Sequence, residues 1–383
     1  MGSTLIVTND FPPRQGGIET FVHAMATRLP DDVVVYTSHE DGDTAFDASL
    51  PFPVIRDRSR TLLPTRRVAR KAVELARAHG CDRVWFGAAA PLALMAPALR
   101  RGGVERIVAT THGHEIWWAK VPGTRWLMRR IGDGVDVVTY LGPYTRSRIV
   151  PALGPSPRLS RLVPGVDADA FRPDAAAAER VRADLRLYGR PVILCVARLV
   201  SRKGVDMLIR ALPLVRRQVP EAVLLVVGDG PDQDRLRSLA RRHADGSVYF
   251  AGGTPHAATP PYYAAADVFA MPCRTRLGGL EAEGLGIVFL EAAASGLPVI
   301  AGDSGGAPDA VLDGRTGRLV DPTDTAAIAE ALTTTLLDPE RAAMGAAGRE
   351  WVRQAWSWDT SARHLAELLA PGHDRAAEVP DGA

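Results

Sequence analysis

Short apolar runs alternate with segments of helical periodicity along most of this chain. Helical spacing is clearest over 18–29, 205–218 and 232–243. Apolar runs that predict buried strands form two series: 4–8, 33–37, 83–87, 107–111 and 135–140 in the first, and 192–197, 223–228, 248–251, 268–271, 298–301 and 318–320 in the second. Strands that are apolar throughout and separated by helices are typical of parallel sheets covered on both faces. The pattern therefore predicts an α/β protein with two doubly wound, Rossmann-like domains.

The segment 162–173 is where we expect the domain boundary, because it contains two prolines and has weak periodicity. We place the N-terminal domain at 1–165 and the C-terminal domain at 166–356. A last helix, 357–370, follows Trp356-Ser357-Trp358 and is expected to cross back onto the first domain. The polar tail 371–383 is expected to be disordered.

Composition narrows the class of protein. Of 383 residues, 46% are hydrophobic and 23% are charged, which excludes a mostly disordered chain. The net charge of +2 argues against a protein that binds polyanions through its overall charge. Cys81, Cys195 and Cys273 are far apart and form no recognisable disulfide or metal pattern. No signal peptide and no apolar run of roughly 18 residues is present, so we expect a cytoplasmic protein, at most peripheral on a membrane.

A loop rich in glycine follows the first predicted strand. Gly16 and Gly17 stand just before a predicted helix, where backbone N–H groups and the helix N-terminus favour an anion. A tight turn explains a Gly-Gly pair equally well. The loop matches neither G-x-G-x-x-G nor a Walker A sequence, which weakens hydride transfer and ATP hydrolysis as functions.

Basic residues occupy the corresponding position in the second domain. Arg198 and Lys203 come after the strand at 192–197 and before a helix, an arrangement that suits a diphosphate. The chain has three lysines, Lys71, Lys120 and Lys203, so a lysine here indicates a position that arginine does not fill. A solvated cluster of charges is the alternative.

Two glutamates, Glu283 and Glu291, flank the apolar run Gly-Leu-Gly-Ile-Val-Phe-Leu. Their carboxylates can accept hydrogen bonds from several hydroxyls, as sugar and ribose recognition requires. Isolated glutamates are usually surface charges. The apolar surroundings favour a ligand here, because a buried carboxylate without a partner is costly.

Together these residues resemble the GT-B glycosyltransferases of family 4, which are retaining nucleotide-sugar enzymes with two domains that face a cleft. The E-x7-E signature of that family matches Glu283 and Glu291. Longer runs, among them TNDFPPRQGGIE, THGHE and EGLGIVFLEA, are similar to the actinobacterial mannosyltransferases that add the second mannose to phosphatidylinositol mannosides. This similarity extends over residues 4 to 365, and it departs from the pattern at 31–60 and 278–282.

The resemblance implies a GDP-mannose donor, a phosphatidylinositol mannoside acceptor and an α-(1-6) linkage to inositol. It also implies a division of labour, with the acceptor on the first domain and the nucleotide sugar on the second. By this resemblance, the diphosphate is bound by Gly16, Gly17, Arg198 and Lys203. Glu283 contacts the sugar, Glu291 contacts the ribose, and the nucleobase lies near Thr254. His112 positions the donor, and Asp10 contacts the acceptor. No protein nucleophile is evident, so the resemblance favours front-face displacement, which is mainly positioning and charge stabilisation.

We expect neither a metal nor a cofactor, because the cations can neutralise the diphosphate. Asp167-Ala168-Asp169 does match the D-x-D metal motif of the other transferase fold. Its place in the interdomain segment makes the match incidental.

A basic segment, 56–71, includes Arg66, Arg67, Arg70 and Lys71 with interleaved leucines and a valine. A second cluster combines Trp117, Trp118 and Trp126 with nearby basic residues. Such combinations suit an anionic membrane surface, although a solvated helix face and core tryptophans give the same pattern. No nucleic-acid motif accompanies them. With a lipid acceptor implied, we expect peripheral binding at the inner face of the plasma membrane.

Three other functions remain open from the sequence. The first keeps the family and changes the acceptor to a polysaccharide or a natural product. The second is a GT-B sugar epimerase, which needs acidic residues for proton transfer that we do not identify. The third is a nucleotide-sugar sensor, which would not need the complete set of candidate residues.

Overall fold

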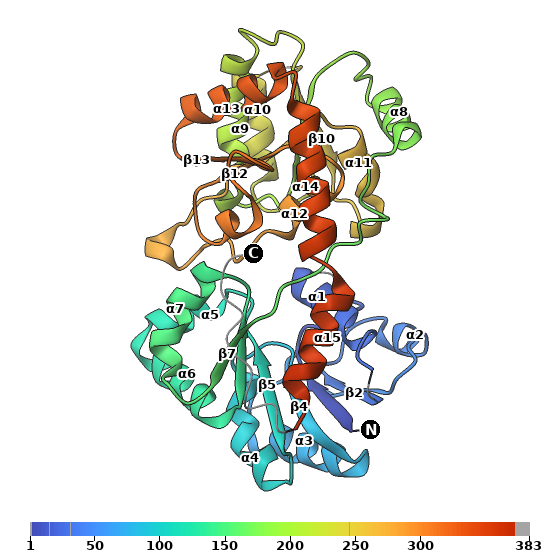
Figure 1. Cartoon of the computed structure of the whole chain (residues 1–383), viewed down its shortest axis with the longest axis vertical. Coiled ribbons are helices and arrows are strands. Elements are labelled where there is room, and N and C mark those ends of the chain that lie inside the picture. Colours follow the sequence, from blue (N-terminus) through green and yellow to red (C-terminus); the bar gives the residue numbers. More distant parts are fainter. Residues whose placement is uncertain (1, 15, 31, 245, 372–383) are drawn as a thin grey trace. The chain divides into compact units, whose positions relative to one another are not determined.

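The computed structural model describes residues 2–14, 16–30, 32–244 and 246–371 (Figure 1). Apart from Pro371, the tail that we expected to be disordered lies outside these residues. The chain divides into two compact units. Unit 1 comprises Met1–Gly165 and Trp358–Ala383, and unit 2 comprises Val166–Ser357. No helix among the described residues is long and apolar enough to cross a membrane.

In the described residues of unit 1, seven strands form a parallel sheet in the order β3-β2-β1-β4-β5-β6-β7. The strands are β1 (Ser3–Val7), β2 (Asp32–Thr37), β3 (Val54–Arg56), β4 (Cys81–Phe86), β5 (Arg106–Thr110), β6 (Val137–Tyr140) and β7 (Arg158–Arg161). Side chains alternate between the two faces, so Leu5 and Val7 join one core cluster and Ile6 joins the other.

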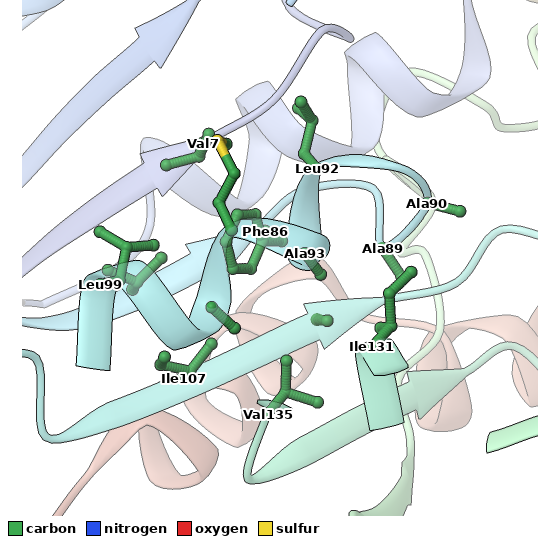
Figure 2. Packing of buried hydrophobic residues seen from close by; sticks show 14 of the residues in the cluster. Val7, Phe86, Ala89, Ala90, Leu92, Ala93, Leu99, Ile107, Ile131 and Val135 are labelled. Atoms are coloured by element: carbon green, nitrogen blue, oxygen red, sulfur yellow. The ribbon is translucent and has the colours of Figure 1, made fainter. Parts of the chain in front are cut away.

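Helices cover both faces of this sheet. They are α1 (Gly17–Ala26), α2 (Asp43–Asp47), α3 (Arg66–Ala78), α4 (Ala96–Arg101), α5 (Glu115–Lys120), α6 (Pro122–Gly134), α7 (Pro143–Leu153) and α15 (Trp358–Leu369), with a short 3-10 helix η1 (Leu92–Met95). Helices α3 to α7 pack on one face, where Phe86, Leu99, Ile107 and Ile131 meet in the core (Figure 2). Helices α1 and α15 pack on the other face.

Helix α15 is the part of unit 1 that comes from the end of the chain (red in Figure 1). Leu365, Leu368 and Leu369 are buried against the sheet. Arg106 of β5 donates from Nε to the carbonyl oxygen of Leu368 at 2.8 Å. The buried leucines and this hydrogen bond attach the helix firmly to unit 1.

In the part of unit 2 that the structure describes, six strands form a parallel sheet in the order β10-β9-β8-β11-β12-β13. The strands are β8 (Val192–Val196), β9 (Val223–Val227), β10 (Val248–Gly252), β11 (Val268–Met271), β12 (Val299–Gly302) and β13 (Gly317–Val320). The α-helices are α8 (Ala175–Asp184), α9 (Val205–Val215), α10 (Gln233–His243), α11 (Pro260–Ala264), α12 (Ile287–Ala294), α13 (Thr325–Leu337) and α14 (Arg341–Ala355). Short 3-10 helices are η2 (Ser201–Lys203), η3 (His256–Ala258), η4 (Leu277–Gly279) and η5 (Ala307–Ala310).

The predicted fold class is confirmed, because each unit is a parallel α/β sheet with covering helices. The apolar pattern missed two strands, β3 and β7, which are the two edges of the unit 1 sheet. Neither contains a buried residue. An edge strand of this kind needs no continuous apolar run, and therefore it gives no strong signal in the sequence.

Candidate active site

The candidate residues of each unit follow the carboxyl ends of its strands. In unit 1, Asp10 comes after β1 and His112 after β5. In unit 2, Arg198 comes after β8 and Thr254 after β10. Because all strands of a sheet run parallel, their carboxyl ends lie along one edge, where open α/β sheets bind ligands.

His112 is held as a neutral imidazole. Its Nε2 lies 2.7 Å from the carbonyl oxygen of Gly87, and because a carbonyl only accepts, Nε2 carries the proton. Burial lowers the pKa of His112, so the ring is neutral near pH 7 and Nδ1 has a free lone pair. The ring meets Phe21 edge-on at 5.1 Å. His112 therefore offers a fixed acceptor nitrogen.

The backbone around His112 is fixed by Glu115 at the start of α5. One oxygen of this buried carboxylate accepts the N–H of His112 at 2.9 Å and that of Gly113 at 3.2 Å. The carboxylate thereby gives a partner to two backbone donors of the loop that precedes α5. Sequence reasoning missed Glu115, which stands in the run THGHE but carries no signal of this contact.

The glycine loop of unit 1 is organised by Arg14, which the sequence analysis also missed. Arg14 donates to Asp10 at 2.8 Å and to Glu19 at 2.6 Å. Burial raises the pKa of the Asp10 carboxyl, and Glu19 adds to the rise while Arg14 opposes it. A Cβ at Gly16 would collide with the Glu19 carboxylate, whereas Gly17 has open space around the same position. A side chain at Gly16 would therefore displace the Glu19 carboxylate, whereas the space beside Gly17 is open.

In unit 2, Lys203 and Glu283 come together at the ends of β8 and β11. Lys203 Nζ lies 2.5 Å from Glu283 Oε2, and Arg202 Nη1 lies 2.8 Å from the same oxygen. Burial alone would raise the pKa of Glu283, but the two cations outweigh it and hold that pKa below its ordinary value. Arg198 is exposed, and no ion pair reaches it from the described residues. The structure therefore joins Lys203 to Glu283 and leaves Arg198 apart.

A glycine explains how Lys203 reaches Glu283. Gly204 has φ of 75°, a conformation that favours glycine. A Cβ there would overlap the carbonyl of Pro272, which follows β11. This close approach places η2 directly beside the segment that leads to Glu283.

Glu291 is buried in α12, and both of its carboxylate oxygens already have partners. His256 Nε2 lies 2.7 Å from Oε1, and the Tyr263 hydroxyl donates to Oε2 at 2.7 Å. The hydrogen bond to Glu291 raises the pKa of His256. The side chain of Glu291 is 2% exposed and that of His256 is 55% exposed. A ligand that reaches Glu291 must therefore share the carboxylate with His256.

Neither His256 nor Tyr263 belongs to a motif in the sequence, and only the fold brings them to Glu291. Thr254 lies just after β10, and its hydroxyl is 3.5 Å from the carbonyl of Gly252. Thr254 precedes His256 by two positions. The segment that we expect to contact the nucleobase therefore also carries the partner of Glu291.

The D-x-D match has a local structural role. Asp167 Oδ1 accepts the N–H groups of Asp169 and Ala170, both at 3.0 Å. This pattern is that of an aspartate that stabilises its own turn. Among the described residues, no group of three or more His, Cys, Asp or Glu side chains could hold a metal ion.

The basic segment on α3 is partly committed to partners within unit 1. Arg67 forms two hydrogen bonds of 2.8 Å with Asp57, which is buried. Lys71 Nζ lies 3.1 Å from Glu74 Oε1. Arg66 and Arg70 are exposed, and no ion pair from the described part of the chain reaches them. Of the four residues predicted to form the membrane patch, Arg66 and Arg70 thus remain available to bind a ligand or a surface.

Known proteins are similar to this chain over nearly its whole length. A protein of Mycolicibacterium smegmatis is 50% identical over 373 residues, which cover 96% of this chain and 98% of that protein. It is described as a GDP-mannose-dependent alpha-(1-6)-phosphatidylinositol monomannoside mannosyltransferase. A Corynebacterium glutamicum protein, described as acting on the monoacylated monomannoside, is 46% identical over 96% of this chain and 97% of its own length. The chain belongs to glycosyltransferase family 4.

Family models match both halves of this family 4 glycosyltransferase. The model described as Glycosyltransferase Family 4 matches residues 15–170, and the model described as Glycosyl transferases group 1 matches residues 178–351. The predicted membership of the family is thereby confirmed.

Solved structures show that the fold is GT-B. Anabaena Alr3699/HepE, solved in complex with UDP and glucose, matches with a TM-score of 0.80 and 20% identity, over 96% of this chain and 99% of that chain. Sucrose-phosphate synthase from Thermosynechococcus elongatus matches with a TM-score of 0.77 and 24% identity, over 96% and 98% of the two chains. At these identities the likeness concerns the fold alone.

Proposed function

We propose that this family 4 glycosyltransferase transfers mannose from GDP-mannose to a phosphatidylinositol mannoside and retains the anomeric configuration. The observation that carries the proposal is the identity of 50% with the M. smegmatis protein over nearly the whole length of both chains. That protein is described by this donor and this acceptor. The charged groups at the strand ends of unit 2 and the acceptor groups of unit 1 suit the two substrates.

Unit 2 is the donor-binding part of this proposal. Lys203 and Arg202 supply positive charge where a diphosphate needs it, and Arg198 adds a cation with no competing partner among the described residues. Glu283 lies beside these cations, and its carboxylate accepts hydrogen bonds from the hydroxyls of mannose. The carboxylate of Glu291, which His256 already contacts, accepts a hydrogen bond from a ribose hydroxyl.

Metal independence follows from the same cations in this proposal. Lys203 and the neighbouring arginines neutralise the diphosphate and stabilise it as a leaving group, which is the task that a divalent cation otherwise performs. We propose that GDP binding persists in excess EDTA. Loss of binding in EDTA would show that a metal is needed.

Unit 1 contributes the acceptor contact and one group that positions the sugar being transferred. Neutral His112 can accept a hydrogen bond at Nδ1, and this fixed group positions the sugar being transferred. Asp10, held by Arg14, can accept a hydrogen bond from the acceptor hydroxyl. We propose front-face displacement, in which the leaving phosphate takes the proton of that hydroxyl. Catalysis is then mainly orientation and charge stabilisation.

A lipid acceptor implies work at a membrane surface. We propose that the enzyme binds the inner face of the plasma membrane, where anionic headgroups attract exposed basic residues. On α3 these residues are Arg66 and Arg70.

The test is transfer by the purified protein. Labelled GDP-mannose is incubated with vesicles that contain phosphatidylinositol monomannoside, and parallel reactions contain UDP-glucose or a polysaccharide acceptor. We expect a dimannosylated lipid with an α anomer by NMR, formed from GDP-mannose alone. Transfer to the polysaccharide but not to the lipid would overturn the acceptor, and use of UDP-glucose alone would overturn the donor.

A further inference from the structure

The tryptophans near α5 fall into two structural groups. Trp118 packs against the core of unit 1. Trp117 is 39% exposed and Trp126 is 58% exposed, and Val121 between them is 41% exposed. These three residues are large apolar groups that the core of unit 1 leaves at the surface. Exposed apolar side chains that occur together on one short segment mark a candidate interaction surface.

The connection between α5 and α6 turns these side chains outward. Val121 is extended, with φ of −82° and ψ of 128°, and Pro122 begins α6 directly after it. The inner faces of the two helices place Ile116 and Ile131 in the core. We call the exposed set Trp117, Val121, Trp126 and the arginines 125, 129 and 130 the α5–α6 corner.

The corner is connected to the candidate site of unit 1. Helix α5 begins three residues after His112, and its Glu115 carboxylate accepts the N–H of His112 at 2.9 Å. The corner is thus built on the loop that follows β5, at the carboxyl edge of the sheet.

The charges of the corner are mainly positive. Residues 115–134 include Lys120 and the arginines 125, 129 and 130, against the acids Glu115 and Asp133. Glu115 is fully buried, so Asp133 is the acid that balances the surface, and it lies 3.3 Å from Arg129. The Arg130 guanidinium lies 5.0 Å from the centre of the Trp126 ring. Indole rings bordered by arginines are the side chains that favour the interface of an anionic bilayer.

We propose that the α5–α6 corner inserts into the interfacial region of an anionic phospholipid membrane. The indoles of Trp117 and Trp126 lie at the level of the headgroups, and the arginines bind phosphates around them. The corner shares one layer with α3, because α3 packs on α4 and α4 packs on α6. Arg66 and Arg70 are exposed on α3 in the same layer of helices. The inference rests on the proposed function, since a lipid acceptor is what requires this contact.

The experiment compares the wild type with Trp117→Ala/Trp126→Ala by co-sedimentation with phosphatidylcholine vesicles that contain or lack phosphatidylinositol. We expect the double variant to bind the anionic vesicles about tenfold more weakly or worse, because it loses two interfacial indoles. Tyr188→Ala is the matched control, since Tyr188 is an aromatic residue of unit 2 that is 64% exposed. It should bind like the wild type.

Two further variants separate apolar from electrostatic binding. Arg125→Ser/Arg130→Ser should weaken binding in low salt and flatten its salt dependence, because screening acts on charges and not on indoles. The Tm of every variant should equal that of the wild type, because the replaced side chains are exposed, and this shows that unit 1 remains folded.

A third measurement does not depend on any variant. Brominated phosphatidylinositol vesicles should quench part of the wild-type tryptophan fluorescence, since the exposed indoles enter the lipid. Absence of quenching, or unchanged sedimentation of the double variant, overturns the inference. Self-association of the wild type that the double variant abolishes, with equal vesicle binding, would assign the corner to a second copy and also overturn it.

The outcome is distinguishable from failure of the proposed function. Transfer to a deacylated, water-soluble phosphatidylinositol mannoside needs no membrane, so the double variant should match the wild type there and be slower only on vesicles. A wild type that binds vesicles through the corner but transfers mannose to neither acceptor would contradict the proposed function alone.

Discussion

The strand ends of the two units differ in how their polar groups are balanced. In unit 2 the carboxylates are already paired, Glu283 with Lys203 and Arg202, and Glu291 with His256. In unit 1, His112 is neutral and its Nδ1 remains available. Unit 1 also has paired charges, because Arg14 contacts the carboxylates of Asp10 and Glu19, but after β5 it presents an uncharged imidazole acceptor that unit 2 lacks among the candidate residues.

This difference indicates two kinds of ligand. Paired charges can exchange partners with a charged ligand at little electrostatic cost, since Lys203 leaves one anion for another. A neutral imidazole does not attract a diphosphate, but it suits hydroxyl groups. The candidate residues of the two units therefore suit different parts of the substrates. Each of the following substitutions tests the residues of one unit.

The largest effect is expected from the ion pair of unit 2. Lys203→Ala removes the nearest cation from buried Glu283 and leaves Arg202 as its partner, so the loss of one charge-assisted hydrogen bond should cost about 1.5–3 kcal/mol of stability. We also expect kcat/KM to fall by about 100-fold or more, because the diphosphate loses its charge-assisted contact.

Denaturant unfolding and steady-state kinetics measure the two quantities. Arg202→Ala is the control, since Arg202 is more exposed than Lys203 and should cost less. The double variant Lys203→Met/Glu283→Leu should recover stability without activity. Equal losses in the two single variants would contradict a special role for Lys203.

The next effect concerns the neutral group of unit 1. His112→Ala should lower kcat/KM by about 100-fold, because it removes the acceptor nitrogen. Burial lowers the pKa of His112, so protonation sets in below the ordinary value of about 6.5. The rate should therefore be constant above neutrality and fall only at lower pH.

His112→Gln separates the two properties, because its amide oxygen can accept a hydrogen bond but does not titrate. We expect partial activity and no acid limb from this residue in the pH profile of kcat/KM. A profile of His112→Gln identical to that of the wild type would show that another group titrates.

A smaller effect is expected from the glycine loop. Gly16→Ala displaces the Glu19 carboxylate and disturbs its hydrogen bond with Arg14, which should cost about 1 kcal/mol. Gly17→Ala is the matched control, since the space at Gly17 is open and the N–H is kept. Thermal unfolding of both variants measures the difference. Equal destabilisation would mean that flexibility, and not space, is what this loop requires.

The smallest effect concerns His256, whose side chain is half exposed. Its folded pKa is raised by Glu291, so its contribution to stability is complete below the unfolded pKa of about 6.5 and is lost as pH rises through the higher folded value. His256→Gln keeps a donor but no charge. The Tm difference between wild type and variant should shrink as pH rises from about 6 to about 9. A difference that does not depend on pH would exclude the charged contact.

Much of the fold could be predicted because buried parallel strands are continuous apolar runs. β8, β9 and β11 were predicted to within a residue or two at each end, while β3 and β7 at the sheet edges were not. The chain divides after Gly165, inside the segment whose prolines and weak periodicity indicated a boundary.

The candidate site was less predictable, because its contacts join distant segments. The sequence identified Lys203 and Glu283 separately, but their contact spans 80 positions and has no local pattern. The basic segment on α3 shows the opposite error, since counting charges overlooks that Arg67 is bound to Asp57. Both limits have one physical cause, namely that pairing is decided by tertiary structure.

The return of α15 to unit 1 affects how the protein is made. Synthesis on the ribosome proceeds from the N-terminus, so all of unit 2 emerges before Trp358 does. Until then the nascent unit 1 lacks Leu365, Leu368 and Leu369, and the sheet face that they cover is open to water. Unit 2 has its complete sequence earlier and can fold first. Helix α15 completes the first domain late in translation, so a chain interrupted before Trp358 retains the candidate donor residues but exposes an apolar face that chaperones and proteases recognise.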